Sequence, residues 1–196
     1  MIRVIPHNTG WVDIWDLPED QAVFREICEQ KTETVIQFST PGAKKWLQHF
    51  NAVRPSLGDK EVHKGLDSIE ALAAFTALDR PGPLDAKVGV GDDEHNMLVE
   101  FARRAKGLEK VGAFPILDKL FPETYGVMVY QEQLQRAFQE VGQTTGIEAN
   151  NFRIHVSKKM PMEMMEDKKI FMKGALQTID QESANQLWSS REQFGQ

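Results

Sequence analysis

The chain has 196 residues, of which 41% are hydrophobic and 27% are charged, and its net charge is −6. This length suits one large domain or two small ones, and the composition is ordinary for a soluble globular protein. The single cysteine, Cys28, excludes an internal disulfide and a cysteine-based zinc site. No apolar run approaches the ~20 residues that span a bilayer, and the N-terminus has no long apolar signal region, so a cytoplasmic protein is expected.

Charge is distributed unevenly along the chain. A net negative charge argues against an isolated nucleic-acid-binding module, because such modules are usually basic. Residues 13–33 are rich in acids, whereas residues 103–106 (RRAK) and 153–159 (RIHVSKK) are basic. The sequence therefore allows a local positive face on an acidic chain.

The first quarter of the chain predicts a helix, a short strand and a second helix. The first helix is expected to begin at Asp16, because an acid followed by Pro18 and two further acids is typical of a helix start. The segment Thr34–Phe38 predicts a strand, and Thr40 and Pro41 form an N-cap and first-position pair for the second helix. The apolar spacing of the first helix predicts a buried stripe that consists of Val23, Phe24, Ile27 and Cys28.

A loop and a third helix follow. Residues 51–65 contain the turn formers and charges of a loop, and Ser68 then caps a helix. The RPGP segment ends that helix, because Pro81 lacks an N–H group and disfavours helical geometry at Arg80.

The second half of the chain predicts four more helices. Either Asp92 or Asp93 is expected to cap a helix that contains Met97, Leu98 and Phe101. The segment TYGVMVYQEQ, residues 124–133, leads into a further helix, Pro161 starts a longer one, and Asp180 caps the last. The methionines in and before the longer helix fit either a core or a surface for a partner.

Together these signals predict a mainly α fold with little or no sheet. Residues 1–196 are expected to form one region, in which residues 51–65 and 85–93 are the loosest links.

A self-contained catalytic or metal site is hard to assemble from this sequence. It has no phosphate-binding G-x-x-x-x-G-K-[ST] loop, no G-x-G-x-x-G turn and no H-E-x-x-H pair, and its five histidines are scattered. The run from Asp92 to Glu94 could bind a cation, but a helix cap is the better interpretation of its aspartates. We therefore predict no catalytic residue and no metal ligand in this chain.

The second basic stretch is a candidate phosphate site. Arg153, Lys158 and Lys159 come just before the helix that starts at Pro161, and the free N–H groups of a helix start attract anions. A solvated charged face is the alternative, and composition alone favours it. Arg80, a single arginine at a rigid turn, also has two interpretations. It could bind a phosphate, or it could simply cap the carbonyls of the preceding helix.

The polar end of TYGVMVYQEQ also has two interpretations. Tyr130, Gln131 and Gln133 could satisfy neighbouring loops at a helix start, or they could offer donors and acceptors to a ligand. Their spacing does not decide between these alternatives.

Five blocks of this sequence resemble, in the same order, those of the C-family bacterial replicative DNA polymerases, the DNA polymerase III alpha subunits. The most specific is TYGVMVYQEQ followed by a helix. The other four are LPEDQAVFREICEQKTETVIQF, IEALAAFTALDRPGPLD, ANNFRIHVSKKMPMEM, which resembles LRRAMGKKKPEEM, and FMKGA, which resembles FxxGA. The resemblance covers roughly residues 14–196.

The resemblance implies a fingers domain, which is mostly helical and closes over the nascent base pair. It implies that the basic residues Arg80, Arg153, Lys158 and Lys159 bind the phosphates of an incoming dNTP, while magnesium in the assembled polymerase handles the developing charge. It also implies that Tyr130, Gln131 and Gln133 line the pocket for the template and the nucleotide. Template–primer DNA is therefore an expected partner, and no cofactor is expected on this chain itself.

The sequence departs from the family pattern at several positions. Ile154 replaces the second arginine, Met160 replaces the third lysine, and Asp79 stands where an aromatic residue is usual before RPGP. The palm carboxylates that hold two metal ions in the family have no counterpart here. The first hypothesis is therefore a fingers part of a split polymerase, in a bacterium or a phage-infected cell, with the palm on another chain. The alternative is a polymerase-derived fragment that serves as a non-catalytic DNA- or protein-binding scaffold.

Overall fold

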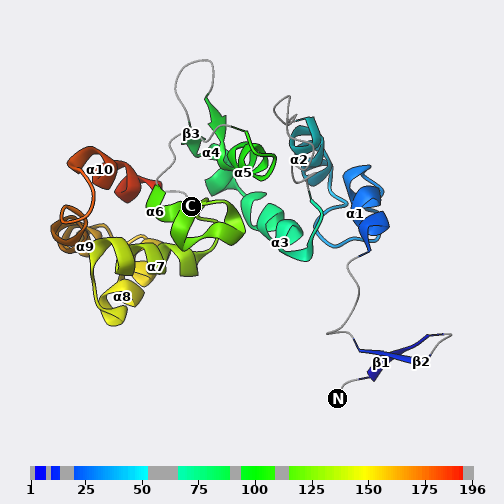
Figure 1. Ribbon diagram of the computed structural model, residues 1–196, viewed down its shortest axis with the longest axis horizontal. Coiled ribbons are helices and arrows are strands. Elements are labelled where there is room, and N and C mark those ends of the chain that lie inside the picture. Colours follow the sequence, from blue (N-terminus) through cyan, green and yellow to red (C-terminus); the bar gives the residue numbers. More distant parts are fainter. Residues whose placement is uncertain are drawn as a thin grey trace.

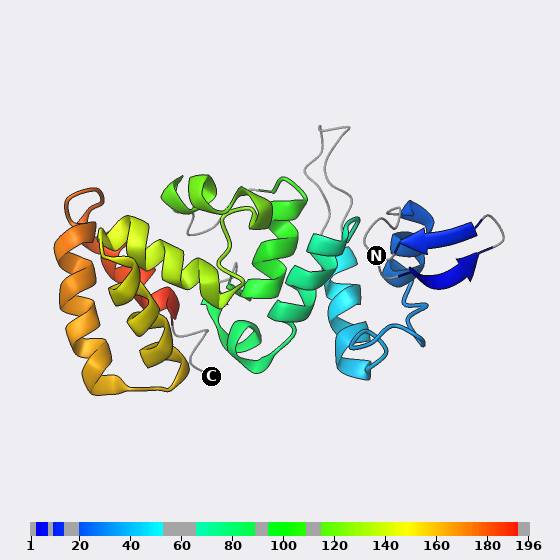
Figure 2. The ribbon, with the colours of Figure 1, turned by 90° about the horizontal axis from the view of Figure 1, so that it is seen from below.

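The fold is mainly α, as predicted, with two short antiparallel strand pairs (Figures 1 and 2). The computed structural model describes residues 3–7, 10–13, 20–52, 66–88, 94–108 and 115–191. Its strands are β1 (Arg3–His7), β2 (Gly10–Asp13), β3 (Lys87–Val88) and β4 (His95–Asn96). Its helices are α1 (Gln21–Cys28), α2 (Pro41–Ala52), α3 (Ile69–Leu78), α4 (Pro81–Asp85), α5 (Met97–Ala105), α6 (Pro115–Leu120), the 3-10 helix η2 (Pro122–Thr124), α7 (Gln131–Gly142), α8 (Gly146–Ser157), α9 (Pro161–Ala175) and α10 (Gln181–Ser189).

The two strand pairs are small and local. Strands β1 and β2 form a hairpin in which Ile5 pairs with Val12, and in both ribbon views this hairpin lies beyond α1 at one end of the molecule. Strands β3 and β4 pair through Lys87 and Asn96 just before α5. Neither pair was predicted, but both are consistent with a fold that has little sheet.

Helix α1 begins later than its sequence signal suggested. Its N-cap is Asp20, whose carboxylate accepts a hydrogen bond of 2.8 Å from the backbone N–H of Ala22. The start predicted at Asp16 lies outside the described residues. Phe24 and Ile27 are buried as expected, but Val23 is 53% exposed, so that part of the predicted stripe is wrong. A helix of eight residues at the edge of the core buries only a narrow arc, and Val23 lies beyond it.

The strand predicted for Thr34–Phe38 is wrong, because this segment folds into turns. Its backbone closes locally, with the N–H of Phe38 bonded to the carbonyl of Val35 at 3.2 Å. The buried hydroxyl of Thr32 donates to the carbonyl of Phe38 at 2.8 Å. Strand-forming residues need a neighbouring strand for their backbone groups, and the described residues provide none here.

The helix caps predicted at Thr40 and Ser68 are confirmed. Their hydroxyls accept hydrogen bonds of 3.1 Å from the N–H groups of Ala43 and Ala71. Helix α2 continues through residues 51–52, which were predicted as loop, and residues 53–65 lie outside the described residues.

The RPGP segment ends α3 as predicted but then starts α4 instead of continuing as a loop. Pro81 takes the first position of α4, where its missing N–H costs nothing.

The cap predicted for α5 is wrong. Asn96, and not Asp92 or Asp93, accepts the hydrogen bond of 3.0 Å from the N–H of Val99. Asp92 and Asp93 lie outside the described residues. Several cap-forming residues precede this helix, and the sequence could not show which of them is in register with its first turn.

The helices of the second half follow the predicted order, with two helices that were not predicted. Asp180 caps α10 as predicted, because its carboxylate accepts a hydrogen bond of 2.9 Å from the N–H of Ser183. Helix α8 was not predicted, although Thr145 and Glu148 form a complete capping box at its start. Helix α6 was also missed.

The buried apolar residues form two clusters. The N-terminal cluster consists of Ile27, Phe38, Leu47, Phe50, Leu66, Ala71, Ala74, Phe75, Leu78, Leu98, Phe101, Ala102, Ala105, Val127 and Val129. The C-terminal cluster consists of Leu117, Phe121, Met128, Leu134, Ala137, Phe138, Val141, Ala149, Phe152, Val156, Phe171, Ala175, Ala184, Leu187 and Trp188.

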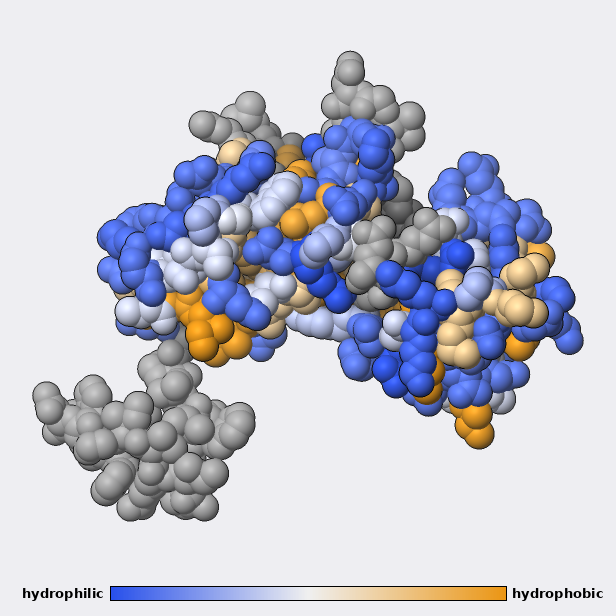
Figure 3. Space-filling model, turned by 180° about the vertical axis from the view of Figure 1, so that it is seen from behind, coloured by the Kyte–Doolittle hydropathy of each residue, from blue (hydrophilic) through white to orange (hydrophobic). Residues whose placement is uncertain are grey.

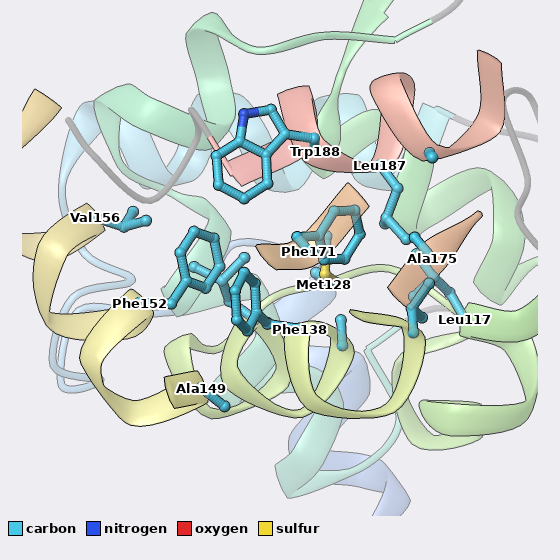
Figure 4. Packing of buried hydrophobic residues seen from close by; sticks show 14 of the residues in the cluster. Leu117, Met128, Phe138, Ala149, Phe152, Val156, Phe171, Ala175, Leu187 and Trp188 are labelled. Atoms are coloured by element: carbon cyan, nitrogen blue, oxygen red, sulfur yellow. The ribbon is translucent and has the colours of Figure 1, made fainter. Parts of the chain in front are cut away.

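Aromatic rings fill the centre of the C-terminal cluster (Figure 4). Phe138 of α7 stacks on Phe152 of α8 with ring centroids 4.1 Å apart, and on Phe171 of α9 at 5.5 Å. Trp188 of α10 covers Phe152 and Phe171 at 5.2 and 5.6 Å. One residue from each of four helices therefore meets at this point, and such aromatic pairs contribute about 0.5–1.5 kcal/mol each beyond their burial.

The segment between η2 and α7 belongs to both clusters. Val127 and Val129 are buried in the N-terminal cluster, whereas Met128 between them is buried in the C-terminal cluster. This alternation is typical of extended backbone, in which successive side chains point in opposite directions. The segment joins the two clusters through three consecutive residues.

Helices α7 and α9 approach so closely that only glycine fits at their contact. A Cβ atom added to Gly174 would lie 1.7 Å from the carbonyl oxygen of Gly142. The side chain of Phe171 closes over Gly142 in the same way, because a Cβ atom there would lie 2.8 Å from its ring. The glycine of the FMKGA block therefore has a packing role.

We predict that Gly174→Ala lowers the free energy of unfolding by at least about 2–3 kcal/mol, because the two helices must move apart. Gly42→Ala is the matched control, since a Cβ atom on Gly42 would have no neighbour within 4 Å. This control should stabilise the protein by about 0.4–1 kcal/mol. Urea unfolding followed by circular dichroism measures both changes, and equal stability of the two variants would contradict the close approach.

Candidate nucleotide-binding site

A tight left-handed turn opens the segment TYGVMVYQEQ. Tyr125 and Gly126 have φ angles of 54° and 75°, and the N–H of Gly126 bonds the carbonyl of Phe121 at 2.9 Å. A Cβ atom on Gly126 would lie 2.1 Å from Oδ1 of Asp118. Both its conformation and its neighbour therefore require glycine at this position.

The side-chain amide of Gln133 fixes the rest of the segment. Its oxygen accepts hydrogen bonds from the backbone N–H groups of Val129 at 2.7 Å and Tyr130 at 3.0 Å. Its nitrogen donates to the hydroxyl of Thr124 at 2.8 Å and to the carboxylate of Glu123 at 3.2 Å. Gln133 is only 6% exposed, so these four bonds satisfy a buried amide.

These bonds give Gln133 a positioning role, which is the first of the two interpretations that the sequence left open. The ligand contact predicted for Gln133 stays a prediction. For Gln133, the interpretation in which the polar end satisfies the neighbouring backbone is therefore confirmed. The ligand interpretation stays a prediction for all three residues.

Tyr130 and Gln131 lie where α7 begins. Tyr130 is the N-cap residue, and its ring packs against the N-terminal cluster while remaining half-buried. Burial raises the pKa of its phenol, and the nearby carboxylates of Glu70 and Glu123 raise that pKa further. The phenol therefore stays neutral and keeps its proton as a donor. Gln131, the first residue of α7, is also half-buried.

Arg80 lies between α3 and α4 and is half-buried. Its Nε atom is buried without a hydrogen-bond partner among the described residues. The capping of α3 carbonyls that we considered for this guanidinium is not seen in that part of the chain. Burial also raises the pKa of the neighbouring Asp79 carboxyl.

Lys158 and Lys159 occupy the turn between α8 and α9. The N–H of Lys159 bonds the carbonyl of Val156 at 3.1 Å, and the N–H of Met160 bonds that of His155 at 2.9 Å. With Lys159 at a φ of 54°, this is the Schellman arrangement that commonly ends a helix. Both lysines are exposed.

Helix α9 begins directly after this turn without a side-chain cap. Its N-cap is Met160, whose side chain accepts no hydrogen bond, and Pro161 follows. The first N–H groups of α9 are thus not satisfied by a cap, as an anion site requires. Glu163 in the first turn is the one negative group there, and it opposes an incoming anion.

Arg153, on α8, is the third basic residue predicted for this hairpin. It is half-buried and donates from Nη2 to the side-chain oxygen of Asn150 at 3.1 Å. The predicted residues therefore fall into two groups, one at the start of α7 and one on the α8–α9 hairpin, with Arg80 between α3 and α4. None of the described contacts joins Arg80 to either group.

The sequence missed a hydrogen bond between two side chains within the same hairpin. Nδ1 of His155 on α8 lies 2.8 Å from Oδ2 of Asp167 on α9. Burial raises the pKa of the Asp167 carboxyl, the bond to His155 opposes that rise, and Glu163 adds to it. The two residues are twelve positions apart and lie on different helices, so no local motif indicated the pair.

Two of the three cations in the first basic stretch, residues 103–106, are buried. Arg104 is buried and bonds the carboxylate of Glu100 and, at 3.2 Å, the carbonyl of Tyr125. Lys106 is buried and donates from Nζ to the carbonyl of Phe50 at 2.6 Å, and burial lowers its pKa. These two cations satisfy internal acceptors and are not available to a ligand.

Hydrophobic residues are scattered between hydrophilic ones on the face that Figure 3 shows. Of the methionines on α9, Met162 and Met165 are exposed, whereas Met164 packs against the C-terminal cluster. The methionines therefore include both core and surface positions, as the two open interpretations allowed.

The described residues contain no group of three or more histidine, cysteine, aspartate or glutamate side chains that could hold a metal ion. Within the same part of the chain, no helix has the length and apolar character that a membrane crossing needs.

Comparison with known proteins identifies the family. The model of the bacterial DNA polymerase III alpha subunit finger domain matches residues 1–178. The chain is 32% identical over 193 residues to a DNA polymerase III subunit alpha of Neisseria meningitidis serogroup A, covering 97% of this chain and 15% of that protein. It is 32% identical over 186 residues to that of Aquifex aeolicus, covering 93% of this chain and 14% of that protein. The chain therefore belongs to the family of bacterial DNA polymerase III alpha subunit finger domains, and it spans about one seventh of the length of these relatives.

We predict that Gln133→Ala lowers the free energy of unfolding by about 2–4 kcal/mol, because it leaves the buried N–H of Val129 and the partly buried N–H of Tyr130 without their acceptor. Gln139→Ala, an exposed position on the same helix, should change stability by less than about 0.5 kcal/mol. Chemical unfolding of both variants tests the difference. A Gln133→Ala variant as stable as the control would show that the amide is not needed.

Proposed function

We propose that this chain is the fingers part of a C-family replicative DNA polymerase and helps bind an incoming dNTP and template–primer DNA. The observation that carries this proposal is the exposed turn of Lys158 and Lys159 at the uncapped start of α9, in a chain of the finger-domain family.

Electrostatics support a triphosphate as the ligand of the hairpin. A helix N-terminus carries a partial positive charge and free N–H donors, and two exposed ammonium groups beside it add full charges. Arg153 on the preceding helix extends this positive region, although Glu163 reduces it. Positive groups at this place hold a triphosphate in line for attack and offset its charge. Arg80, with a buried donor that has no partner among the described residues, is proposed as a further phosphate contact.

The start of α7 is proposed as the edge of the template–nucleotide pocket. Tyr130 offers a flat ring and a neutral hydroxyl, Gln131 offers an amide, and the bonds of Gln133 hold both in place. Aromatic rings and amides recognise bases through stacking and through hydrogen bonds. The phenol of Tyr130 is uncharged near neutral pH at its ordinary pKa, and burial raises that pKa further.

The reaction itself requires groups that this chain is not proposed to supply. Two-metal phosphoryl transfer needs clustered carboxylates, and the described residues hold no such cluster. We propose that a palm on another chain provides them together with magnesium, as in a split polymerase of a bacterium or a phage. The chain alone would then not polymerise DNA.

Primer extension tests this proposal. The reaction would be measured with this chain, with a palm-bearing chain, and with both together. Mixing should raise extension well above either chain alone, because only the mixture contains both the carboxylates and the triphosphate site. An absence of gain on mixing would contradict the split-polymerase proposal and would favour the non-catalytic scaffold.

Binding of inorganic tripolyphosphate tests the hairpin separately. We predict that Lys158→Ala/Lys159→Ala weakens binding at least about tenfold at low salt, because charged hydrogen bonds contribute about 1.5–3 kcal/mol each. Lys168→Ala/Lys173→Ala is the matched control, since it removes two exposed lysines from the body of α9. Isothermal titration calorimetry measures both. Equal losses in the two variants would assign the effect to net charge and would remove the turn as a site.

A further inference from the structure

The α8–α9 hairpin holds its lysine turn by an interaction that neither the sequence pattern nor the family comparison indicates. His155 in the last turn of α8 bonds Asp167 in α9 at 2.8 Å. Asp167 is only 7% exposed, and the side chain of His155 is 22% exposed. A carboxylate has thus been removed from water to make one bond between two helices.

His155 is tied to the turn by its backbone as well as by its ring. Its carbonyl accepts the N–H of Met160 at 2.9 Å, and this bond closes a loop that contains both lysines. Its ring at the same time anchors the end of α8 to α9. A movement of His155 would therefore change the path of the backbone that carries Lys158 and Lys159.

The turn needs such support. Lys159 has a φ of 54°, a left-handed conformation that residues other than glycine adopt infrequently and mostly where a motif such as this helix end holds them. Two long lysine side chains on an unsupported turn would also lose more conformational entropy on binding a ligand.

Stability alone explains the pair poorly. A buried bond to a carboxylate contributes little net stability, because the desolvation of the carboxylate offsets the gain from the bond. The raised pKa of Asp167 reports that desolvation. A bond of this kind does, however, select one arrangement of the groups that it joins, and such support lowers the cost of binding.

We propose that His155, held by Asp167, is a positioning residue that fixes the turn of Lys158 and Lys159 for a polyphosphate ligand. This inference rests on the proposed function of the hairpin. It assigns no contact between His155 and the ligand, since the effect passes through the backbone of the turn.

Four variants test the hydrogen bond between His155 and Asp167: two break it, and two change one partner but keep a donor or an acceptor. His155→Leu and Asp167→Leu each break it. His155→Asn places an amide donor at the position of Nδ1, and Asp167→Asn keeps an acceptor while removing the charge. His49→Leu, an exposed histidine of α2 in the N-terminal half, is the matched control.

Tripolyphosphate affinity should follow the bond. We expect His155→Leu and Asp167→Leu to weaken binding about 3- to 10-fold each, and the double variant to be no weaker than either one, because both remove the same interaction. His155→Asn should stay within about twofold of the unchanged protein, as should His49→Leu. Affinity is measured by calorimetry at a temperature at which circular dichroism shows every variant fully folded, and urea unfolding is measured separately.

A second measurement observes the turn without ligand. Hydrogen exchange of the Met160 N–H reports the bond to the His155 carbonyl, and it should accelerate in both leucine variants and remain slow in His155→Asn. Should a leucine variant fail to fold, His155→Gln serves instead, because its donor lies one bond farther out than Nδ1.

The outcomes distinguish the inference from the proposal beneath it. If the leucine variants lose stability but keep the affinity and the slow exchange of the unchanged protein, the pair is structural only and the inference is wrong. If the unchanged protein binds tripolyphosphate no better than Lys158→Ala/Lys159→Ala, the proposed site is wrong and the inference falls with it. Loss of affinity in the leucine variants, recovery in His155→Asn and sensitivity to the two lysines together support both.

Discussion

The side-chain amide of Gln133 holds an extended segment, residues 127–129, that both hydrophobic clusters share. In a helical protein, an extended segment without a partner strand leaves its backbone N–H groups unsatisfied unless side chains bond them. Gln133 bonds those of Val129 and Tyr130 and at the same time reaches Thr124 before the segment. The alternation of Val127, Met128 and Val129 between the two clusters, and the start of α7, depend on this arrangement.

The sequence predicted three of the helix starts that local chemistry decides, although it misplaced the cap of α5 and missed the capping box of α8. The caps at Thr40, Ser68 and Asp180 follow from a side chain and the three residues after it, and all three are present. The strand predicted at Thr34–Phe38 is wrong because β-propensity has no effect without a strand to pair with. The bonds of Gln133 are local and match one of the two interpretations that the sequence left open. His155 bonds a residue of another helix, and no local pattern indicates that contact.

The same limit applies to the basic residues. Composition treats all cations alike, whereas the structure separates those that satisfy internal acceptors from those that remain exposed. Lys106 bonds a carbonyl 56 positions away, and this contact removes it from the surface. Lys158 and Lys159 lie in the turn between α8 and α9, and both are exposed to solvent. Resemblance to the family indicated Lys158 and Lys159 as phosphate contacts. Only the fold could show that Arg104 and Lys106 bond internal acceptors.

The alternating burial of Val127, Met128 and Val129 has a mechanical consequence. A shift of this segment by a single position would exchange its two faces, moving a methionine out of one cluster and valines out of the other. Each displaced side chain would forfeit about 1.5–3 kcal/mol of burial. A register shift at this point would therefore cost burial in both clusters at once, so the two clusters together hold the segment in one position.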